Sequence, residues 1–169
     1  MANYHTLAQE LIKSAANFRP IDKKQAAALE ELALYLKEKI AKNQTIQLNF
    51  ICTHNSRRSQ LAQVMAQVLA AYFKLEKFAS FSGGTEVTAF HPNAVQALRH
   101  LGVDIQLLEP GDNPRYLVTT GNLKSIAFSK HLDHPDNPKE NFAAILVCDT
   151  AEANCPYVAG CEKRISLPW

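Results

Sequence analysis

The stretch "TIQLNFICTHNSRRSQLAQ", residues 45–63, decides the fold of this chain. Its first eight residues alternate apolar and polar side chains, which predicts a β-strand that ends at Cys52. From Ser59 onward the apolar side chains recur at helical spacing. Residues 52–58 are therefore predicted to turn directly from a strand into a helix.

The same patterns predict the other elements of the chain. Helices are expected over 4–18, 22–43, 91–102 and 150–155, strands over 77–84, 142–148 and 164–167, and a β-hairpin over 115–130 around Gly121 and Asn122. Strands that alternate with helices predict an α/β fold with an open parallel sheet. The two helices of residues 1–43 are expected to form a helical hairpin packed on a catalytic domain of residues 44–169.

Composition narrows the class of protein. The chain has 169 residues, which fits one domain, and 47% of them are hydrophobic. Its 18 Lys and Arg against 16 Asp and Glu give a net charge of +2, which favours neither a nucleic-acid partner nor a membrane partner. The N-terminal residues show no secretory signal, so we expect a cytoplasmic protein with its four cysteines reduced.

The turn after the first strand has the chemistry of an oxyanion site. In parallel sheets, ligands bind at the carboxyl ends of strands, where Cys52 lies. The N–H groups and dipole of the following helix attract an anion, and they favour the thiolate form of a cysteine beneath it. Arg58 can grip two oxygens of a tetrahedral anion, and Ser59 can donate a hydrogen bond to the thiolate. Asn55 and Ser56 are turn formers whose side chains can bond the loop backbone.

Three segments resemble a known superfamily. "CTHNSRRSQLAQ" (52–63) is similar to the phosphate loop of low-molecular-weight protein tyrosine phosphatases and thioredoxin-coupled arsenate reductases, which share one fold. "SGGTEVTAFHPNAVQALRHLGVDI" (82–105) and "CDTAEANCP" (148–156) continue the similarity, which covers residues 45–108 and 142–168. The N-terminal helices and residues 109–141 look like additions.

The resemblance implies roles for the loop residues. Cys52 would be the nucleophile, Arg58 the oxyanion clamp and Ser59 the support of the thiolate. The remaining loop residues would bind the substrate: Thr53, His54, Asn55, Ser56 and Arg57. The resemblance implies no metal and no organic cofactor.

Phosphomonoester hydrolysis, with phosphotyrosine as the expected substrate, is the leading hypothesis. Cys52 would attack phosphorus and form a phosphocysteine, while a carboxylic acid protonates the leaving group. In the phosphatases that acid is an Asp, usually followed by Pro. We expect its equivalent just beyond Trp169.

Thioredoxin-coupled arsenate reduction is the alternative. Cys148 and Cys155 are seven residues apart, a spacing similar to the redox pair of these reductases. Thioredoxin would then be the reductant. Cys148 could equally be a core residue at the end of a buried strand. Arg57 stands where these reductases often carry a further cysteine.

Three smaller expectations complete the interpretation. A non-catalytic binder of oxyanions or phosphoproteins is a third hypothesis, although such a protein would need no thiol. His54 is expected to support the loop, and "HLDHPD" (131–136) to be a solvated loop rather than a metal site. Gly83 and Gly84 are expected to let the backbone pass close to the anion loop.

Overall fold

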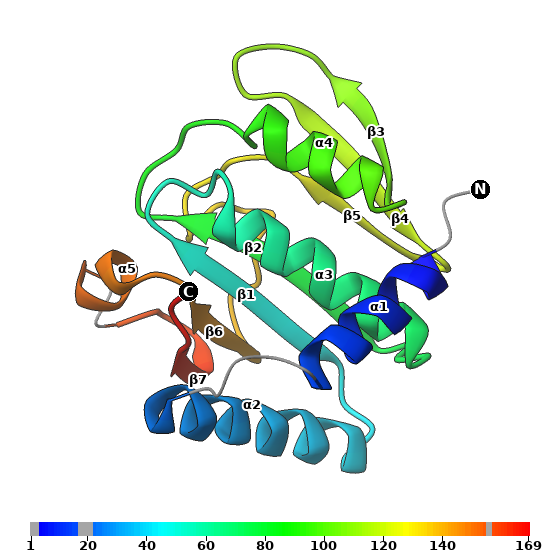
Figure 1. Cartoon of the computed structure of the whole chain (residues 1–169). Coiled ribbons are helices and arrows are strands. Elements are labelled where there is room, and N and C mark those ends of the chain that lie inside the picture. Colours follow the sequence, from blue (N-terminus) through cyan, green and yellow to red (C-terminus); the bar gives the residue numbers. More distant parts are fainter. Residues whose placement is uncertain (1–3, 17–21, 155–156) are drawn as a thin grey trace.

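The computed structural model describes residues 4–16, 22–154 and 157–169. Two sheets organise it (Figure 1). A four-stranded parallel sheet has the order β2-β1-β6-β7, and a three-stranded antiparallel sheet has the order β3-β4-β5. The elements in chain order are α1 (Tyr4–Ala16), α2 (Lys23–Ala41), β1 (Ile46–Cys52), α3 (Arg58–Tyr72), β2 (Phe78–Gly84), α4 (Pro92–His100), β3 (Asp104–Glu109), β4 (Arg115–Thr120), β5 (Leu123–Ala127), β6 (Phe142–Leu146), α5 (Asp149–Asn154) and β7 (Cys161–Ser166). The α/β fold with a parallel sheet, predicted from sequence, is confirmed.

Strand β1 is central in the parallel sheet. It pairs with β2 along its whole length, so that Cys52 lies opposite Gly84. On its other side, Ile51 lies opposite Leu146 of β6. Because all these strands are parallel, their carboxyl ends meet at one edge of the sheet. That edge gathers the loop after β1, the end of β2 and the start of α5.

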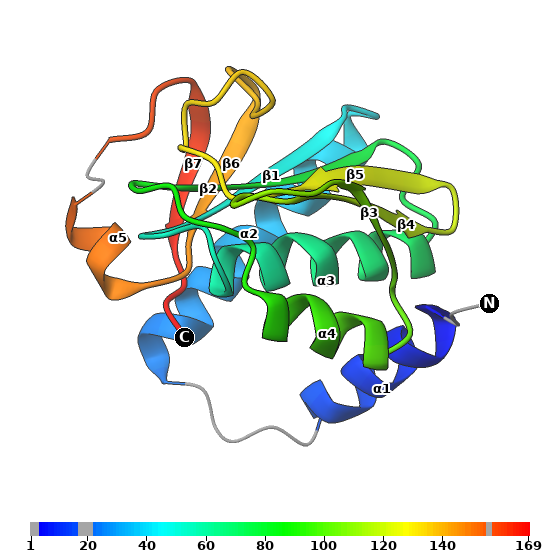
Figure 2. The same ribbon diagram turned by 90° about the horizontal axis from the view of Figure 1, so that it is seen from above.

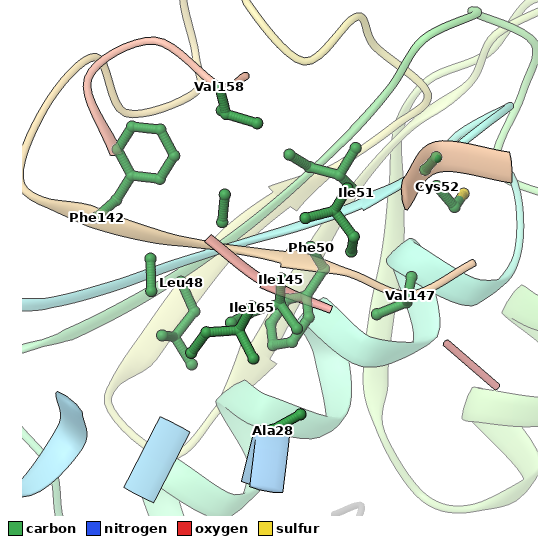
Figure 3. Packing of buried hydrophobic residues seen from close by; sticks show 14 of the residues in the cluster. Ala28, Leu48, Phe50, Ile51, Cys52, Phe142, Ile145, Val147, Val158 and Ile165 are labelled. Atoms are coloured by element: carbon green, nitrogen blue, oxygen red, sulfur yellow. The ribbon is translucent and has the colours of Figure 1, made fainter. Parts of the chain in front are cut away.

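The sheet is buried on both faces. Figure 3 shows Leu48, Phe50 and Ala28 of α2 on one side of the strands, with Ile51 and Val158 on the other. Helices α2 and α3 cover the same face of this sheet (Figure 2). A second apolar cluster forms where α1, α3 and α4 meet β3, β4 and β5. Helix α3 therefore lies between the two clusters.

The antiparallel sheet contains one strand that sequence reasoning missed. The predicted hairpin is present as β4 and β5, joined through Gly121 at a φ of 58°. Strand β3 pairs with β4 on its outer side and was not expected. Within the strand, apolar and polar residues alternate only over residues 104–107 before Leu108 breaks the pattern, and this run is at the lower limit of length from which a strand can be recognised.

The two N-terminal helices pack on the core separately. Asp22 caps α2 by accepting a 2.7 Å hydrogen bond from the Gln25 backbone N–H. Helix α1 packs on α3 through Leu7 and Ala8, whereas α2 packs on β7 and β1. The expected helical hairpin is therefore wrong, because each helix buries its apolar face against a different neighbour. The predicted end of the first helix, residues 17 and 18, lies outside the described residues.

Candidate active site

The loop between β1 and α3 holds a row of open backbone donors. Within the described part of the chain, the N–H groups of residues 54–57 have no hydrogen-bond acceptor. Arg57 occupies the N-cap position of α3 but supplies no side-chain cap. Asn55 adopts a left-handed backbone conformation, with a φ of 46°, which bends the loop. Consecutive open N–H groups above a helix N-terminus form an anion-binding concavity.

The Cys52 sulfur lies beneath this loop and is nearly buried, with 3% of the residue exposed. Its Sγ is 3.0 Å from the Ser59 Oγ. The Asn55 side-chain amide donates a 2.8 Å hydrogen bond to that same Ser59 oxygen. Since this oxygen already accepts from Asn55, the Ser59 hydroxyl proton is free to point at the sulfur. The arrangement is consistent with the role predicted for Ser59, the support of a thiolate.

A buried network fixes the loop from below. The Asn55 Oδ1 accepts hydrogen bonds from the Lys130 backbone N–H at 2.8 Å and from the Gln60 Nε2 at 3.2 Å. The His54 carbonyl accepts from the hydroxyl groups of Thr88 and Ser129, each at 3.0 Å. Sequence reasoning missed these supports because residues 128–130 reach the loop only through the tertiary fold.

The end of β2 passes very close to the loop. A Cβ added to Gly84 would lie 2.6 Å from the Thr53 carbonyl oxygen and 2.8 Å from the Asn55 nitrogen. Real Cβ atoms do not approach backbone atoms so closely. The close passage expected for the glycine pair is thereby confirmed at Gly84.

A small pocket of about 130 Å³ opens above the sulfur, lined by Cys52, His54, Ser56, Arg57 and Arg58. Neither Arg57 nor Arg58 is paired with a carboxylate among the described residues, so both guanidinium groups can take up an anion. The other predicted loop residues, Thr53, Asn55 and Ser59, do not line this pocket.

The rim of the pocket carries one carboxylate that sequence reasoning did not single out. The Glu86 carboxylate is 3.2 Å from the Nε2 of His54, and both side chains are more than half exposed. Ser56, also at the pocket, is fixed by a 2.7 Å hydrogen bond from its hydroxyl to the Ala89 carbonyl.

Cys148 lies beside the loop, two residues after the end of β6. It is buried, with 1% of the residue exposed, and its Sγ is 3.6 Å from the hydroxyl oxygen of Thr53, the residue after Cys52. The Ala151 backbone N–H donates to the same sulfur at 3.3 Å. Figure 3 shows Cys52 at the border of the apolar core, next to the ribbon of α5. Cys155 lies outside the described residues.

The histidines of residues 131–136 are bound to nearby carboxylates. His131 pairs with Asp133, and the Nδ1 of His134 is 4.0 Å from the Asp136 carboxylate. Over residues 4–16, 22–154 and 157–169, no group of three or more His, Cys, Asp and Glu side chains is placed to hold a metal ion. The same ranges contain no helix that is long and apolar enough to cross a membrane.

The fold and the loop define a class: α/β proteins with a cysteine at the start of a loop of open backbone N–H groups, between a central strand and its following helix. No protein-family model matches the chain. Arsenate reductase 2 of Staphylococcus epidermidis is 25% identical over 115 residues, which are 68% of this chain and 70% of that protein. An arsenate reductase of Staphylococcus aureus is 27% identical over the same shares of both chains.

The chain also aligns with solved structures. One of them is a thioredoxin-dependent arsenate reductase of Corynebacterium glutamicum, with a TM-score of 0.40 and 18% identity over 98% of this chain and 82% of that one. The sequence similarities confirm the predicted resemblance of the chain to arsenate reductases.

Proposed function

We propose that this protein reduces arsenate, with Cys52 as the nucleophile and thioredoxin as the reductant. The position of Cys148, buried beside the Cys52 loop, is the observation that carries the proposal. The similarity to arsenate reductases supports it, and it favours this alternative over the phosphatase hypothesis that leads on sequence alone.

The first step is attack on arsenic. The Cys52 thiolate forms an S–As bond and one arsenate oxygen leaves as water, while Arg58 and the open loop N–H groups hold the other oxygens. The Ser59 hydroxyl, 3.0 Å from the sulfur, stabilises the thiolate before attack. Arg57, unpaired at the same pocket, adds positive charge toward the anion.

The second step transfers two electrons. The Cys148 thiolate attacks the Cys52 sulfur, a disulfide forms, and the S–As bond breaks with its electron pair on arsenic, which leaves as arsenite. The Ala151 N–H donates to the Cys148 sulfur and holds it in position beside the loop. Cys148 is too buried for a protein reductant to reach. We infer that the Cys155 thiolate attacks the Cys148 sulfur, so that a Cys148–Cys155 disulfide forms and Cys52 leaves as a thiolate. Thioredoxin then reduces the Cys148–Cys155 disulfide by the same exchange.

A coupled assay tests the proposal. Arsenate, thioredoxin, thioredoxin reductase and NADPH are mixed with the protein, and NADPH consumption is followed. We expect arsenate-dependent consumption that Cys148→Ser and Cys155→Ser each abolish. The control is Cys161→Ser, which changes a partly exposed cysteine on β7 and should leave the rate unchanged. Full activity of Cys148→Ser would overturn the assigned redox role.

Phosphomonoester hydrolysis is the second candidate, because phosphate has the same tetrahedral shape as arsenate and suits the same pocket. The test is release of p-nitrophenol from p-nitrophenyl phosphate. Hydrolysis that Cys52→Ser abolishes and Cys148→Ser leaves intact, without arsenate-dependent NADPH consumption, would identify a phosphatase. Phosphate binding without either reaction would favour the non-catalytic binder.

A further inference from the structure

A second cavity lies away from the Cys52 loop, between β2, β5 and α3. This β2–β5 pocket has a volume of about 220 Å³, and its lining includes Gln63, Ser125, Lys130, Phe78 and Ile126. It shares no lining residue with the Cys52 pocket. Nothing in the proposed reaction uses it.

Three polar atoms of this lining are buried without a partner among the described residues. They are the Gln63 Oε1, the Ser125 Oγ and the Lys130 Nζ. A buried polar group without a hydrogen bond is costly, and a buried ammonium group costs far more than a neutral one. Three such atoms around one cavity indicate that the cavity is built for a polar ligand.

Lys130 is the dominant group of the three. Only 3% of the residue is exposed, and its Nζ lies 4.6 Å from the centroid of the Phe128 ring. Asp136 also lines the pocket, but its Oδ2 faces the Arg115 guanidinium at 3.3 Å and forms no ion pair with Lys130. Arg115 pairs with Asp136 and also lies 3.7 Å from the Glu109 carboxylate. The Lys130 ammonium pairs with no carboxylate among the described residues and can take one negative charge from a ligand.

We propose that the β2–β5 pocket binds a small carboxylic acid that also carries a hydroxyl or amino group. The carboxylate would accept hydrogen bonds from the Lys130 ammonium and the Ser125 hydroxyl. The hydroxyl or amino group would donate to the Gln63 carbonyl oxygen. The short carbon skeleton would contact the apolar side of the lining, such as Phe78 and Ile126.

The charge and the apolar walls of the pocket favour a monocarboxylate over inorganic phosphate. Lys124 of the lining is exposed, so Lys130 is the one buried ammonium group there and balances one negative charge. A second charge on phosphate would be buried without compensation. Apolar walls suit a ligand with carbon atoms and not a bare oxyanion.

The pocket is connected to the Cys52 loop through the backbone of Lys130. The Lys130 N–H donates to the Asn55 side chain, and its carbonyl accepts from the Gly84 N–H at 2.9 Å. A ligand that fixes the Lys130 side chain therefore also steadies two contacts of the loop.

The test is an NMR titration of the ¹⁵N-labelled full chain with L-lactate, acetate and inorganic phosphate in parallel. Lactate should shift the amide signals of residues 123–126 and 130 in a saturable manner. Acetate should bind more weakly, because it has no donor for Gln63. Phosphate should instead shift the signals of residues 53–58.

Substitutions test whether the side chains of Lys130 and Ser125 bind lactate. Lys130→Met should weaken lactate binding by about tenfold or more, the typical effect of losing a charge-assisted hydrogen bond. Ser125→Ala should weaken it by about threefold or more. The control Lys37→Met, at an exposed lysine of α2, should bind lactate as the wild type does.

Two results would overturn the proposal: lactate shifts confined to residues 53–58 or absent altogether, or an unchanged affinity in the variants. The dispersion of the spectrum shows whether Lys130→Met is folded. If that variant does not fold, Ser125→Ala alone decides, because removing one hydroxyl oxygen leaves the strand intact.

Discussion

At the scale of the residue, the proposed chemistry depends on the sulfur atom of Cys52. We expect Cys52→Ser to abolish turnover of arsenate, because a serine hydroxyl is a far weaker nucleophile than a thiolate. Phosphate should still bind, since Arg58 and the loop N–H groups remain. The measurement pairs the coupled assay with a phosphate titration. Full turnover by the variant would rule out Cys52 as the nucleophile.

Asn55 shows how one side chain can hold a loop. It donates to Ser59, accepts from the Lys130 N–H, and takes a left-handed backbone conformation. We expect Asn55→Ala to lower the free energy of unfolding by about 2–4 kcal/mol, because buried partners lose their hydrogen bonds and alanine tolerates this conformation poorly. Urea denaturation measures the loss.

A matched control exists at Asn43, which is exposed and has a similar φ of 52°. Asn43→Ala should lower the free energy of unfolding by about 1 kcal/mol, the cost of placing alanine in a left-handed backbone conformation. The difference between the two variants therefore isolates the buried hydrogen bonds of Asn55. Equal losses would show that those bonds contribute nothing to stability.

At the scale of the element, the end of β2 must lie against the Cys52 loop. Gly84→Ala would place a Cβ 2.5 Å from the Glu86 carbonyl oxygen and 2.6 Å from that of Thr53, and backbone atoms cannot give way cheaply. We expect a stable fold with a displaced loop, and a loss of arsenate turnover of about tenfold or more, as misplaced catalytic groups typically produce.

The control for this substitution is Gly111→Ala. A Cβ there meets no atom within 4 Å, although the φ of 144° makes the substitution somewhat strained. Its stability should fall slightly while its turnover stays at the wild-type rate. Wild-type turnover in Gly84→Ala would show that the loop position tolerates the shift.

Helix α2 is fixed to β7 by a polar cluster around Glu162. Its carboxylate accepts from the Tyr35 hydroxyl at 2.9 Å and pairs with the ammonium group of Lys39, whose side chain is only 8% exposed. Burial, together with Glu162, raises the pKa of Tyr35. Glu162→Ala should lower the free energy of unfolding, measured by urea denaturation, by about 3 kcal/mol, because it leaves a buried cation unpaired.

The control is Glu31→Ala, which removes an exposed partner of Lys163. It should change the free energy of unfolding by less than about 1 kcal/mol in the same urea denaturation experiment.

At the scale of the whole molecule, Lys130 makes stability depend on pH. Burial, the largest cause, and the charge of Arg115 lower the pKa of Lys130 to about 8, although Asp136 opposes the change. Between about pH 8 and the unfolded value near 10.5, the unfolded chain binds more protons at this residue than the folded one. The contribution of Lys130 to the free energy of unfolding therefore rises with pH between those two values.

The expected size of this rise is on the order of 2–3 kcal/mol. Lys130→Met removes the titrating group, so its stability should rise less than that of the wild type between about pH 7.5 and about pH 10. Urea denaturation at the two pH values gives the comparison, with Lys37→Met as the control that keeps the wild-type slope. Parallel slopes in Lys130→Met and the wild type would contradict the lowered pKa.

Local patterns were sufficient for the elements around the site. The alternation before Cys52 and the helical spacing after Ser59 are short-range properties, so they locate the loop and its nucleophile without a structure. The cap at Asp22 and the hairpin at Gly121 follow from neighbouring residues in the same way. Strand β3 was not predicted, because its pairing with β4 defines it and the spacing of its own apolar residues does not.

The sequence by itself determined the α/β class, the strand-loop-helix around Cys52 and the candidate clamp at Arg58. Only the tertiary structure placed Cys148 beside Thr53, Gly84 against the loop and Lys130 at a cavity. Cys148 and Thr53 are 95 residues apart in the chain. The register of parallel strands decides such meetings, and no local periodicity encodes that register.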